Sequence, residues 1–248
     1  MKVNRMHTDK QQATLVAVEG IDGSGKGTQT ELLKERLQKD GLSVARMQFP
    51  RYSDTTFGQA IGDFLNGRFG SLEQVHPQLA AVLYAGDRFE SRELLLSHMQ
   101  ECDIVILDRY TGSNLAHQGA KVSDTDRSDL VAWIDRVEHE IFGLPRPHLN
   151  VLIDISSQWS RELVGRKGER DYTNETADIQ EADQDYLEGV RSVYRTLAAE
   201  RTDWQVVCSL DENEELRSVE SINDEILDLI RTVHGSPGAS GHVPRSPF

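Results

Sequence analysis

A glycine-rich segment that ends in a lysine carries the clearest chemical signal in this sequence. It reads GIDGSGK from Gly20 to Lys26, with the spacing G-x4-G-K of a phosphate-binding loop. Glycines let the backbone turn its N–H groups inward around a polyphosphate, and Lys26 supplies a cation. A glycine-rich turn can also be only a turn, but an apolar strand before it and a helix after it are the context that the motif requires. We predict that a nucleoside triphosphate binds along one segment: Gly20, Ile21, Asp22, Gly23, Ser24, Gly25, Lys26, Gly27 and Thr28.

The residue after the lysine departs from the usual pattern. A Ser or Thr whose hydroxyl holds Mg²⁺ normally follows the lysine, but this chain has Gly27, and Thr28 comes one position later. The same GKGT segment is similar to that of adenylate kinases, where the ion is held largely through waters. We still expect Mg²⁺ as the cofactor, because phosphoryl transfer needs its charge on the phosphate oxygens. Thr28 is therefore only a secondary candidate for a metal ligand.

Two further charged residues follow the apolar segment IVIL. Asp108 and Arg109 stand at the carboxyl end of this predicted strand, where ligands bind in open α/β sheets. We predict that Asp108 holds the metal through water and that Arg109 clamps a phosphate with two parallel hydrogen bonds. An ion pair at the strand end, or a helix cap, is the alternative for the two residues.

Short apolar runs alternate with longer amphipathic stretches along the whole chain, a pattern typical of a parallel sheet with crossover helices. The predicted strands are Thr14–Glu19, Ser43–Phe49, Ile104–Asp108, Leu149–Ile153 and Trp204–Cys208. The predicted helices are Lys26–Asp40, Pro77–Gln100, Asp124–Phe142, Ser157–Val164, Glu181–Arg201 and Ser218–His234. We predict one α/β domain over 13–234 with helices on both faces of a five-stranded parallel sheet. The ends, 1–12 and 235–248, are poor in apolar residues and are expected to be flexible.

Composition disfavours several classes of function. The chain has 41 acidic and 27 basic residues, and its net charge of −14 repels a polyanion, so we expect no nucleic-acid partner. No run approaches the roughly 18 apolar residues of a membrane span, and the first residues lack the apolar stretch of a secretory signal. We therefore expect a cytoplasmic protein without a membrane partner. Cys102 and Cys208 have no metal or redox spacing and are expected to be structural thiols.

The ordered combination of motifs resembles the thymidylate kinase family. The resemblance covers about Leu15 to His234 and is carried by VAVEGIDGSGKGTQ, FPRYSDTTFG, LYAGDRFE, DRYTGSNLAHQGA and the basic stretch GRKGERDY. It implies a P-loop NTPase fold with a small basic lid at about 165–176. It also implies transfer of the γ-phosphoryl group of ATP to dTMP, with Mg²⁺, in a homodimer.

The same resemblance implies how the acceptor is bound. Tyr84 takes the place of the aromatic residue that stacks on thymine, and Arg88 that of the arginine that donates to a base carbonyl. Gln118 corresponds to a position beside the base, Arg51 resembles the arginine that binds the monophosphate, and Tyr172 corresponds to a tyrosine near the sugar. A core tyrosine and a surface arginine are the structural alternative for Tyr84 and Arg88.

The resemblance also implies a catalytic group. Its members are Lys26, Asp22, Arg109, Arg166 and Arg170. Asp22 matches a carboxylate that reaches toward the sugar hydroxyl of the acceptor, and Arg109 matches the arginine that bridges the two phosphates. Arg166 and Arg170 would fold over the phosphates with the lid and exclude water. An ordinary turn aspartate and a solvated charge run are the alternatives for Asp22 and the lid.

Two other functions remain open at the level of the sequence. A kinase of another pyrimidine nucleotide or of a deoxynucleoside would share the fold and the phosphate loop. A P-loop protein that uses nucleotide as a binding signal is conceivable because of Gly27. The aromatic residue and the arginine predicted at the base argue against such a switch, and an acceptor panel separates the three.

Overall fold

The computed structural model describes residues 13–71, 74–164 and 184–235. At its centre lies a five-stranded sheet in the order β2-β3-β1-β4-β5, with every neighbouring pair parallel. The strands are β1 (Thr14–Glu19), β2 (Val44–Gln48), β3 (Ile104–Asp108), β4 (Leu149–Asp154) and β5 (Trp204–Cys208). The predicted five-stranded parallel sheet is confirmed, and the bounds of each strand agree within one residue.

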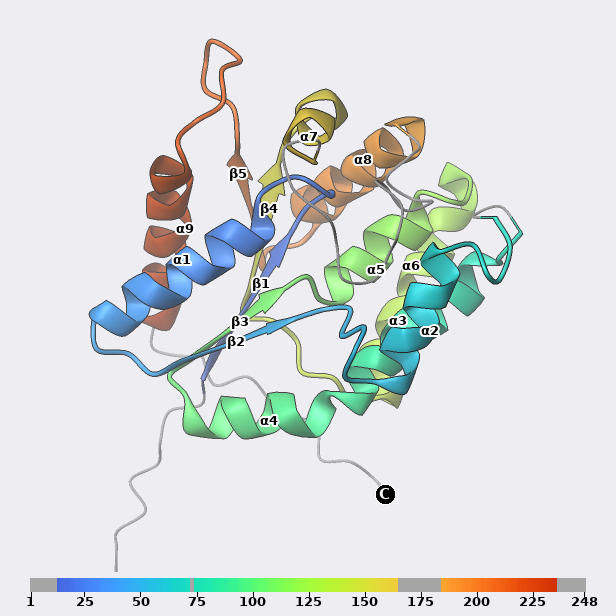
Figure 1. Cartoon of the computed structure of the whole chain (residues 1–248), viewed down its shortest axis with the longest axis horizontal. Helices are drawn as coiled ribbons and strands as arrows, with labels where there is room; N and C mark the ends of the chain where they lie inside the picture. The colour runs from blue at the N-terminus through green and yellow to red at the C-terminus, as the bar shows by residue number, and fades with distance from the viewer. Residues whose placement is uncertain (1–12, 72–73, 165–183, 236–248) are drawn as a thin grey trace, which may run out of the picture.

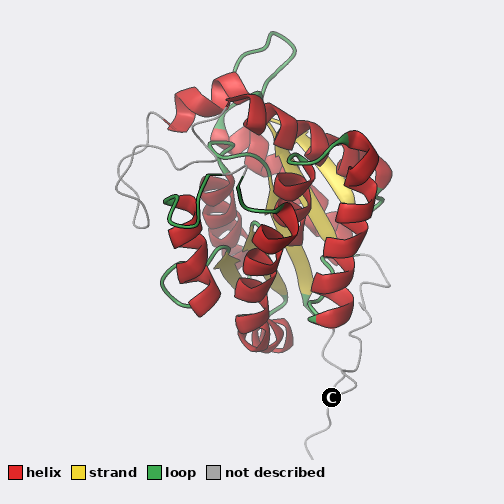
Figure 2. Ribbon diagram, turned by 90° about the vertical axis from the view of Figure 1, so that its right-hand side faces the viewer, coloured by secondary structure: helices red, strands yellow, loops and turns green. Residues whose placement is uncertain are grey.

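Helices connect and cover these strands in the part of the chain that the structure describes. They are α1 (Lys26–Lys39), α2 (Thr56–Leu65), α3 (Pro77–Glu90), α4 (Arg92–Glu101), α5 (Thr111–Gly119), α6 (Asp124–Asp135), the π-helix η1 (Arg136–Ile141), α7 (Ser157–Val164), α8 (Gln184–Glu200) and α9 (Val219–His234). Figure 2 shows the strands as a layer enclosed by helices.

The two faces of the sheet follow from the alternation of side chains along each strand. In β1, Val16 and Val18 face a core built with α1 and α9, while Leu15 and Ala17 face a core that includes α4. Helices α5 and α8 complete that second side around β4 and β5, so helices lie on both faces as predicted (Figure 1). Strand β1 is buried along its whole length, which explains its nearly continuous apolar sequence.

The order of the strands creates a crevice between the ends of β1 and β3. The chain leaves β1 toward β2 on one side of the sheet and leaves β3 toward β4 on the other. Open α/β sheets bind ligands at such a switch point, because the loops that follow the two neighbouring strands run in opposite directions there. The loop after Glu19 and the loop after Asp108 meet at this edge.

The helix predicted over Pro77–Gln100 is wrong, because the chain breaks it at Ser91 into α3 and α4. Helix α3 packs against α2 and α5, whereas Leu95 and Met99 of α4 fill the core under β3. One straight helix cannot serve both places. Ser91 is fully buried at the junction, and its hydroxyl accepts a hydrogen bond from Arg51.

The helix predicted over Asp124–Phe142 is also interrupted. It is regular only to Asp135 and continues as η1, whose wider turn buries Val137, Glu138 and His139 in succession. Helices α2 and α5 were not predicted, since both lie in short, glycine-containing motif segments. The remaining predicted helices differ from the observed bounds by at most three residues.

The lid predicted at about 165–176 lies outside the described residues, as do 1–12 and 236–248. Among the helices that the structure describes, none has the length and apolar character needed to span a bilayer.

Candidate active site

The phosphate loop is held in its turn by close backbone contacts. A side chain at Gly20 would place its Cβ 2.7 Å from the carbonyl oxygen of Ile153, and Gly25 caps α1 with φ of 90°. Lys26 is buried and donates to the carbonyl oxygen of Ile21 at 2.7 Å and to Ser24 Oγ at 3.3 Å. Burial, together with the smaller effect of nearby Arg109, lowers the pKa of Lys26 to about 7. An anion bound in this loop would therefore meet a cation that protein carbonyl and hydroxyl groups only partly satisfy.

Arg109 crosses from β3 to the phosphate loop. Its guanidinium donates to the Asp22 carboxylate at 2.5 Å, to the carbonyl oxygen of Gly20 at 3.1 Å and to Ser113 Oγ at 3.3 Å. Burial alone would lower the pKa of Arg109, but Asp22 and other acidic neighbours raise it well above its usual range. Arg109 has a φ of 64°, a left-handed conformation that is uncommon for non-glycine residues and is found at functional sites. The structure thus places Arg109, which is predicted to clamp a phosphate, against the phosphate loop.

Glu19 is a buried carboxylate of this site that the sequence analysis did not identify. It ends β1 and accepts hydrogen bonds from the Tyr110 backbone N–H at 2.9 Å, Ser113 Oγ at 2.6 Å and Tyr194 at 3.1 Å. Burial raises the pKa of Glu19 despite these bonds. Since Ser113 also accepts from Arg109, Glu19 fixes one of the contacts that aim the guanidinium.

Asp108, the predicted metal residue, forms an ion pair in the structure. Arg46 of β2 donates to Asp108 Oδ2 at 3.0 Å and to Thr30 Oγ at 2.8 Å. A Cβ at Gly27 would lie 3.3 Å from the same Asp108 oxygen, so the missing side chain leaves room for this carboxylate beside the loop. Thr28, the secondary candidate, is exposed on α1.

Groups of three or more acidic, histidine or cysteine side chains that could hold a metal ion are absent among the described residues.

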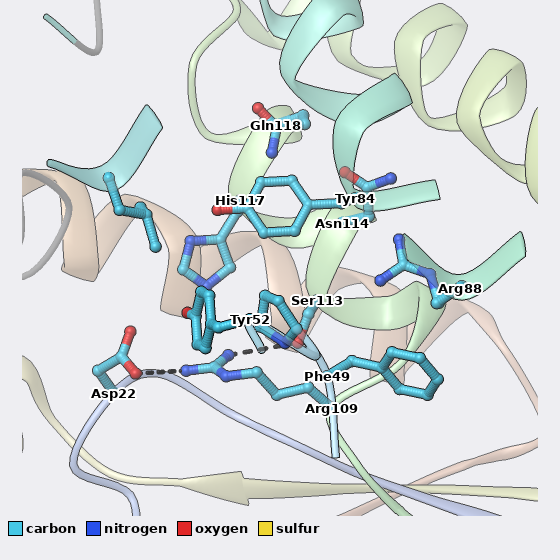
Figure 3. A pocket seen from close by; sticks show the side chains of 12 residues that line it. Asp22, Phe49, Tyr52, Tyr84, Arg88, Arg109, Ser113, Asn114, His117 and Gln118 are labelled. Carbon is cyan, nitrogen blue, oxygen red and sulfur yellow. Dashed lines mark hydrogen bonds and ion pairs between the residues drawn. The ribbon is translucent and has the colours of Figure 1, made fainter. Parts of the chain in front are cut away.

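A pocket of about 470 Å³ opens beside Arg109 (Figure 3). Its lining consists of Asp22, Phe49, Pro50, Tyr52, Leu65, Tyr84, Arg88, Arg109, Ser113, Asn114, His117 and Gln118. The structure thus brings together five predicted site residues: Asp22, Tyr84, Arg88, Arg109 and Gln118.

The pocket walls come from the ends of several helices and loops. Helix α3 supplies Tyr84 and Arg88, while α5 supplies Asn114, His117 and Gln118 at positions three and four apart, which share one helix face. Burial lowers the pKa of His117 to about 3, so its imidazole is neutral, and its Nδ1 lies 3.1 Å from the hydroxyl of Tyr186. The pocket therefore combines aromatic surface with neutral polar groups at this end.

Two polar atoms in the pocket wall have no hydrogen-bond partner within the described part of the chain. They are Asn114 Oδ1, an acceptor, and Gln118 Nε2, a donor, and both are buried. The other ends of both side chains are occupied, because Asn114 Nδ2 donates to the carbonyl oxygen of Ala81 and Gln118 Oε1 accepts from Lys121. Buried polar groups are nearly always paired, so these atoms mark where a ligand would bond.

Arg88 is buried at 2% exposure and is not the surface arginine of the structural alternative. Its Nε and one terminal nitrogen each lie 2.6 Å from the Glu138 carboxylate. Burial would lower the pKa of Arg88, but the charge of Glu138 and its hydrogen bonds raise it overall. The other terminal nitrogen is not used in this pair and remains for the pocket.

Arg51 is the predicted substrate residue that does not line the pocket. Its guanidinium donates to Ser91 and Asp54, and its backbone N–H donates to the buried Asp87 carboxylate at 3.0 Å. Asp87 also accepts from Thr55 at 2.5 Å, and thereby fastens the segment before α2 to α3. Three further predicted residues, Arg166, Arg170 and Tyr172, lie outside the described residues.

Several functional candidates were missed in sequence reasoning although their motifs were recognised. Asn114 stands in the segment DRYTGSNLAHQGA, and its spacing to Gln118 would have placed both on one helix face. Glu138, in contrast, lies in a separate stretch with ordinary helical character, and nothing in its local pattern indicates contact with α3.

The family model described as thymidylate kinase matches residues 18–221. The chain belongs to the thymidylate kinase family. Thymidylate kinase of Mycobacterium tuberculosis is 33% identical over 186 residues, which are 75% of this chain and 86% of that protein. A probable thymidylate kinase of Thermococcus onnurineus is 30% identical over 220 residues, 87% of this chain and 96% of its relative.

The fold is shared with a solved thymidylate kinase structure from Candida albicans. The two superpose with a TM-score of 0.68 at 20% identity, covering 91% of this chain and 95% of the other. Members of the thymidylate kinase family phosphorylate dTMP to dTDP, and the chain is accordingly a phosphotransferase.

Proposed function

We propose that the chain binds dTMP in the pocket between α3 and α5 and transfers to it the γ-phosphoryl group of ATP held by the phosphate loop. The pocket opens beside Arg109, which also contacts Asp22 of that loop. Two anions bound in these places would therefore meet end to end across one guanidinium. Alignment of this kind replaces a bimolecular encounter and supplies much of the rate enhancement.

The observation that carries the choice of base is the pattern of hydrogen-bonding groups in the pocket. Arg88 can only donate, Asn114 Oδ1 is an orphan acceptor, and Gln118 Nε2 is an orphan donor. The imide edge of thymine presents a carbonyl, an N–H and a second carbonyl, which is the complementary order. Cytosine replaces the imide N–H and one carbonyl by an acceptor and an amine. Tyr84 supplies an aromatic face against which the ring would stack.

The phosphate end needs charge rather than a general base. The acceptor oxygen of a monophosphate is already ionised, so Lys26 and Arg109 would act by neutralising charge that develops on the transferred group. The assignments of Arg51, Arg166, Arg170 and Tyr172 to the substrates remain predictions from the sequence resemblance.

Mg²⁺ is proposed as the cofactor that travels with ATP. Asp108 is the carboxylate beside the loop that would hold its water shell, and Gly27 leaves space next to it. When bound, the ion supplies positive charge to the β- and γ-phosphate oxygens. A cytoplasmic location and a homodimer likewise remain predictions.

An acceptor panel tests the proposed function. Purified chain is incubated with ATP, Mg²⁺ and dTMP, dUMP, dCMP or dAMP, and the release of ADP is followed. We expect turnover that depends on dTMP, lower turnover with dUMP and least with dCMP and dAMP. Preference for another acceptor would refute the proposal. So would ADP release at a rate that does not depend on any of the four acceptors.

Two variants test the phosphate end. Lys26→Ala and Arg109→Ala should each lower kcat by roughly 100-fold or more, as removal of a group that stabilises transition-state charge usually does. Circular dichroism provides the control, because both variants should keep the helical content of the parent chain. An unchanged kcat in a folded variant removes that residue from the mechanism.

A further inference from the structure

The carboxylate of Glu138 is a feature of this molecule that neither the phosphate loop nor the pocket lining explains. It has zero exposure, yet it lies on η1, far along the chain from every predicted site residue. Burying a carboxylate and a guanidinium together rarely stabilises a fold compared with apolar packing. A buried pair of this kind therefore calls for a role beyond stability.

Three donors converge on this one carboxylate. Arg88 Nε reaches Oε2 and a terminal nitrogen of Arg88 reaches Oε1, both at 2.6 Å, and Asn114 Nδ2 reaches Oε1 at 2.8 Å. Arg88 comes from α3 and Asn114 from α5. Glu138 thus joins α3 and α5 through Arg88 and Asn114. Both of these side chains line the pocket (Figure 3).

The chemistry of these contacts decides which way the Asn114 amide points. Both of its N–H groups are directed at acceptor oxygens, the Ala81 carbonyl oxygen at 3.0 Å and Glu138 Oε1 at 2.8 Å. A flipped amide would set its oxygen against two acceptors. Asn114 Oδ1 is consequently left as the buried acceptor without a partner among the described residues.

We propose that Glu138 is a positioning residue for base selection, which holds Arg88 as a donor and Asn114 as an acceptor toward the imide edge of the base. The inference rests on the proposed function, because it assumes that the pyrimidine lies in this pocket. The π-helix is the structural device that makes it possible, since its wide turn directs Glu138 into the interior between neighbours that are also buried.

The variant Glu138→Gln tests this role. Its amide has one oxygen and cannot accept from all three donors, so Arg88 and Asn114 are held less firmly as the donor and the acceptor that favour thymine over cytosine. We expect the ratio of the dCMP and dTMP dissociation constants, measured by calorimetry, to fall by roughly 10- to 100-fold. The KM for dTMP should rise while kcat changes little. A ratio within twofold of the parent chain overturns the proposal, even if the variant melts at a lower temperature.

Asp135→Asn is the matched control. Asp135 is the neighbouring carboxylate at the end of α6, and it pairs with Arg146 at 2.6 Å and Arg201 at 3.4 Å without lining the pocket. Its loss should lower the melting temperature and leave the ratio of dissociation constants unchanged. An equal change of the ratio in this control would mean that any damage to the region alters base choice, and would overturn the assignment.

A double-mutant cycle separates positioning from general loosening. In an Asn114→Ala background, Glu138→Gln should change the ratio much less than it does alone, because one of its two targets is gone. Fully additive effects would contradict the proposal. If Glu138→Gln does not fold, Glu138→Asp takes its place in the cycle, because it keeps the charge but is too short to hold all three donors.

A crystal structure of the unaltered chain with dTMP gives a readout that needs no variant. Asn114 Oδ1 should lie within hydrogen-bond distance of the base N3, and Arg88 should contact a ring carbonyl while still paired with Glu138. A base that touches neither residue overturns the inference. A chain that does not turn over dTMP at all refutes the proposed function instead, so the two failures are distinguishable.

Discussion

At the scale of single residues, the site is built from charged side chains that the fold buries. Lys26 is the clearest case, because its ammonium group is buried and relies on the Ile21 carbonyl oxygen and Ser24. Its pKa of about 7 lies well below the usual 10.5 of lysine. Phosphate oxygens in the loop would favour the charged form, so nucleotide binding should raise this pKa.

This shift predicts that binding of a triphosphate takes up protons between pH 7 and about 10. Since the complex holds a proton that the free loop has partly lost, affinity should fall as the pH rises through this range. Calorimetry of inorganic tripolyphosphate at pH 8, in buffers with different ionisation enthalpies, measures the uptake. Lys26→Arg is the control, because its guanidinium is always protonated and should abolish the uptake. Equal uptake in that variant would assign the proton to another group.

Residues that act through long-range contacts were the hardest to predict. The phosphate loop and Arg109 are recognisable because backbone geometry and chemistry restrict them to a local pattern. Glu19 and Glu138 act on residues 94 and 50 positions away, respectively, and their side chains look like ordinary acidic residues in the sequence. Only the folded chain shows that each is buried against residues that we propose to bind ligand.

At the scale of elements, two helices and one sheet edge determine where the chemistry lies. The strands could be predicted because buried parallel strands have nearly continuous apolar sequences. Helices α2 and α5 were missed, since they are short and rich in residues that avoid helices, and the break at Ser91 depends on packing against two different cores. Tertiary contacts, which local sequence does not encode, decided these elements.

Gly112 shows how tightly α5 is placed. A Cβ at this position would lie 2.8 Å from Glu19 Oε1 and 2.8 Å from the Trp204 ring, both of which are buried and cannot move aside freely. Gly112→Ala should therefore destabilise the chain by about 1–3 kcal/mol, although alanine favours helices, because overpacking outweighs propensity. Urea denaturation measures the loss.

Gly189→Ala in α8 is the matched comparison for that experiment. Its Cβ would meet only the Ala120 Cβ at 3.8 Å, an ordinary contact. This variant should be as stable as the parent or more stable, by up to about 1 kcal/mol. If both alanine variants behave alike, the position of α5 is less constrained than the contacts of Gly112 imply.

At the scale of the whole molecule, acidic residues exceed basic ones by enough to matter for stability. A net charge of −14 opposes compaction through repulsion between like charges, and salt screens this repulsion. We predict that the melting temperature rises between about 0.01 M and 1 M potassium chloride, where the Debye length shortens from ~30 Å to ~3 Å. Scanning calorimetry over this series, with sucrose as a non-ionic control, provides the test. A melting temperature that falls with potassium chloride would mean that attractive ion pairs dominate the electrostatics.

Asp87 and Arg88 are consecutive residues of α3 with different attachments. Asp87 fastens the backbone of Arg51 and the start of α2, while Arg88 is fixed to Glu138 at the base end of the pocket. Because the two residues are adjacent in α3, this helix fixes the position of the Arg88 side chain relative to the loop that enters α2. Any displacement of α3 would therefore move the Arg88 side chain and the entry to α2 together, so these two parts of the molecule cannot shift independently.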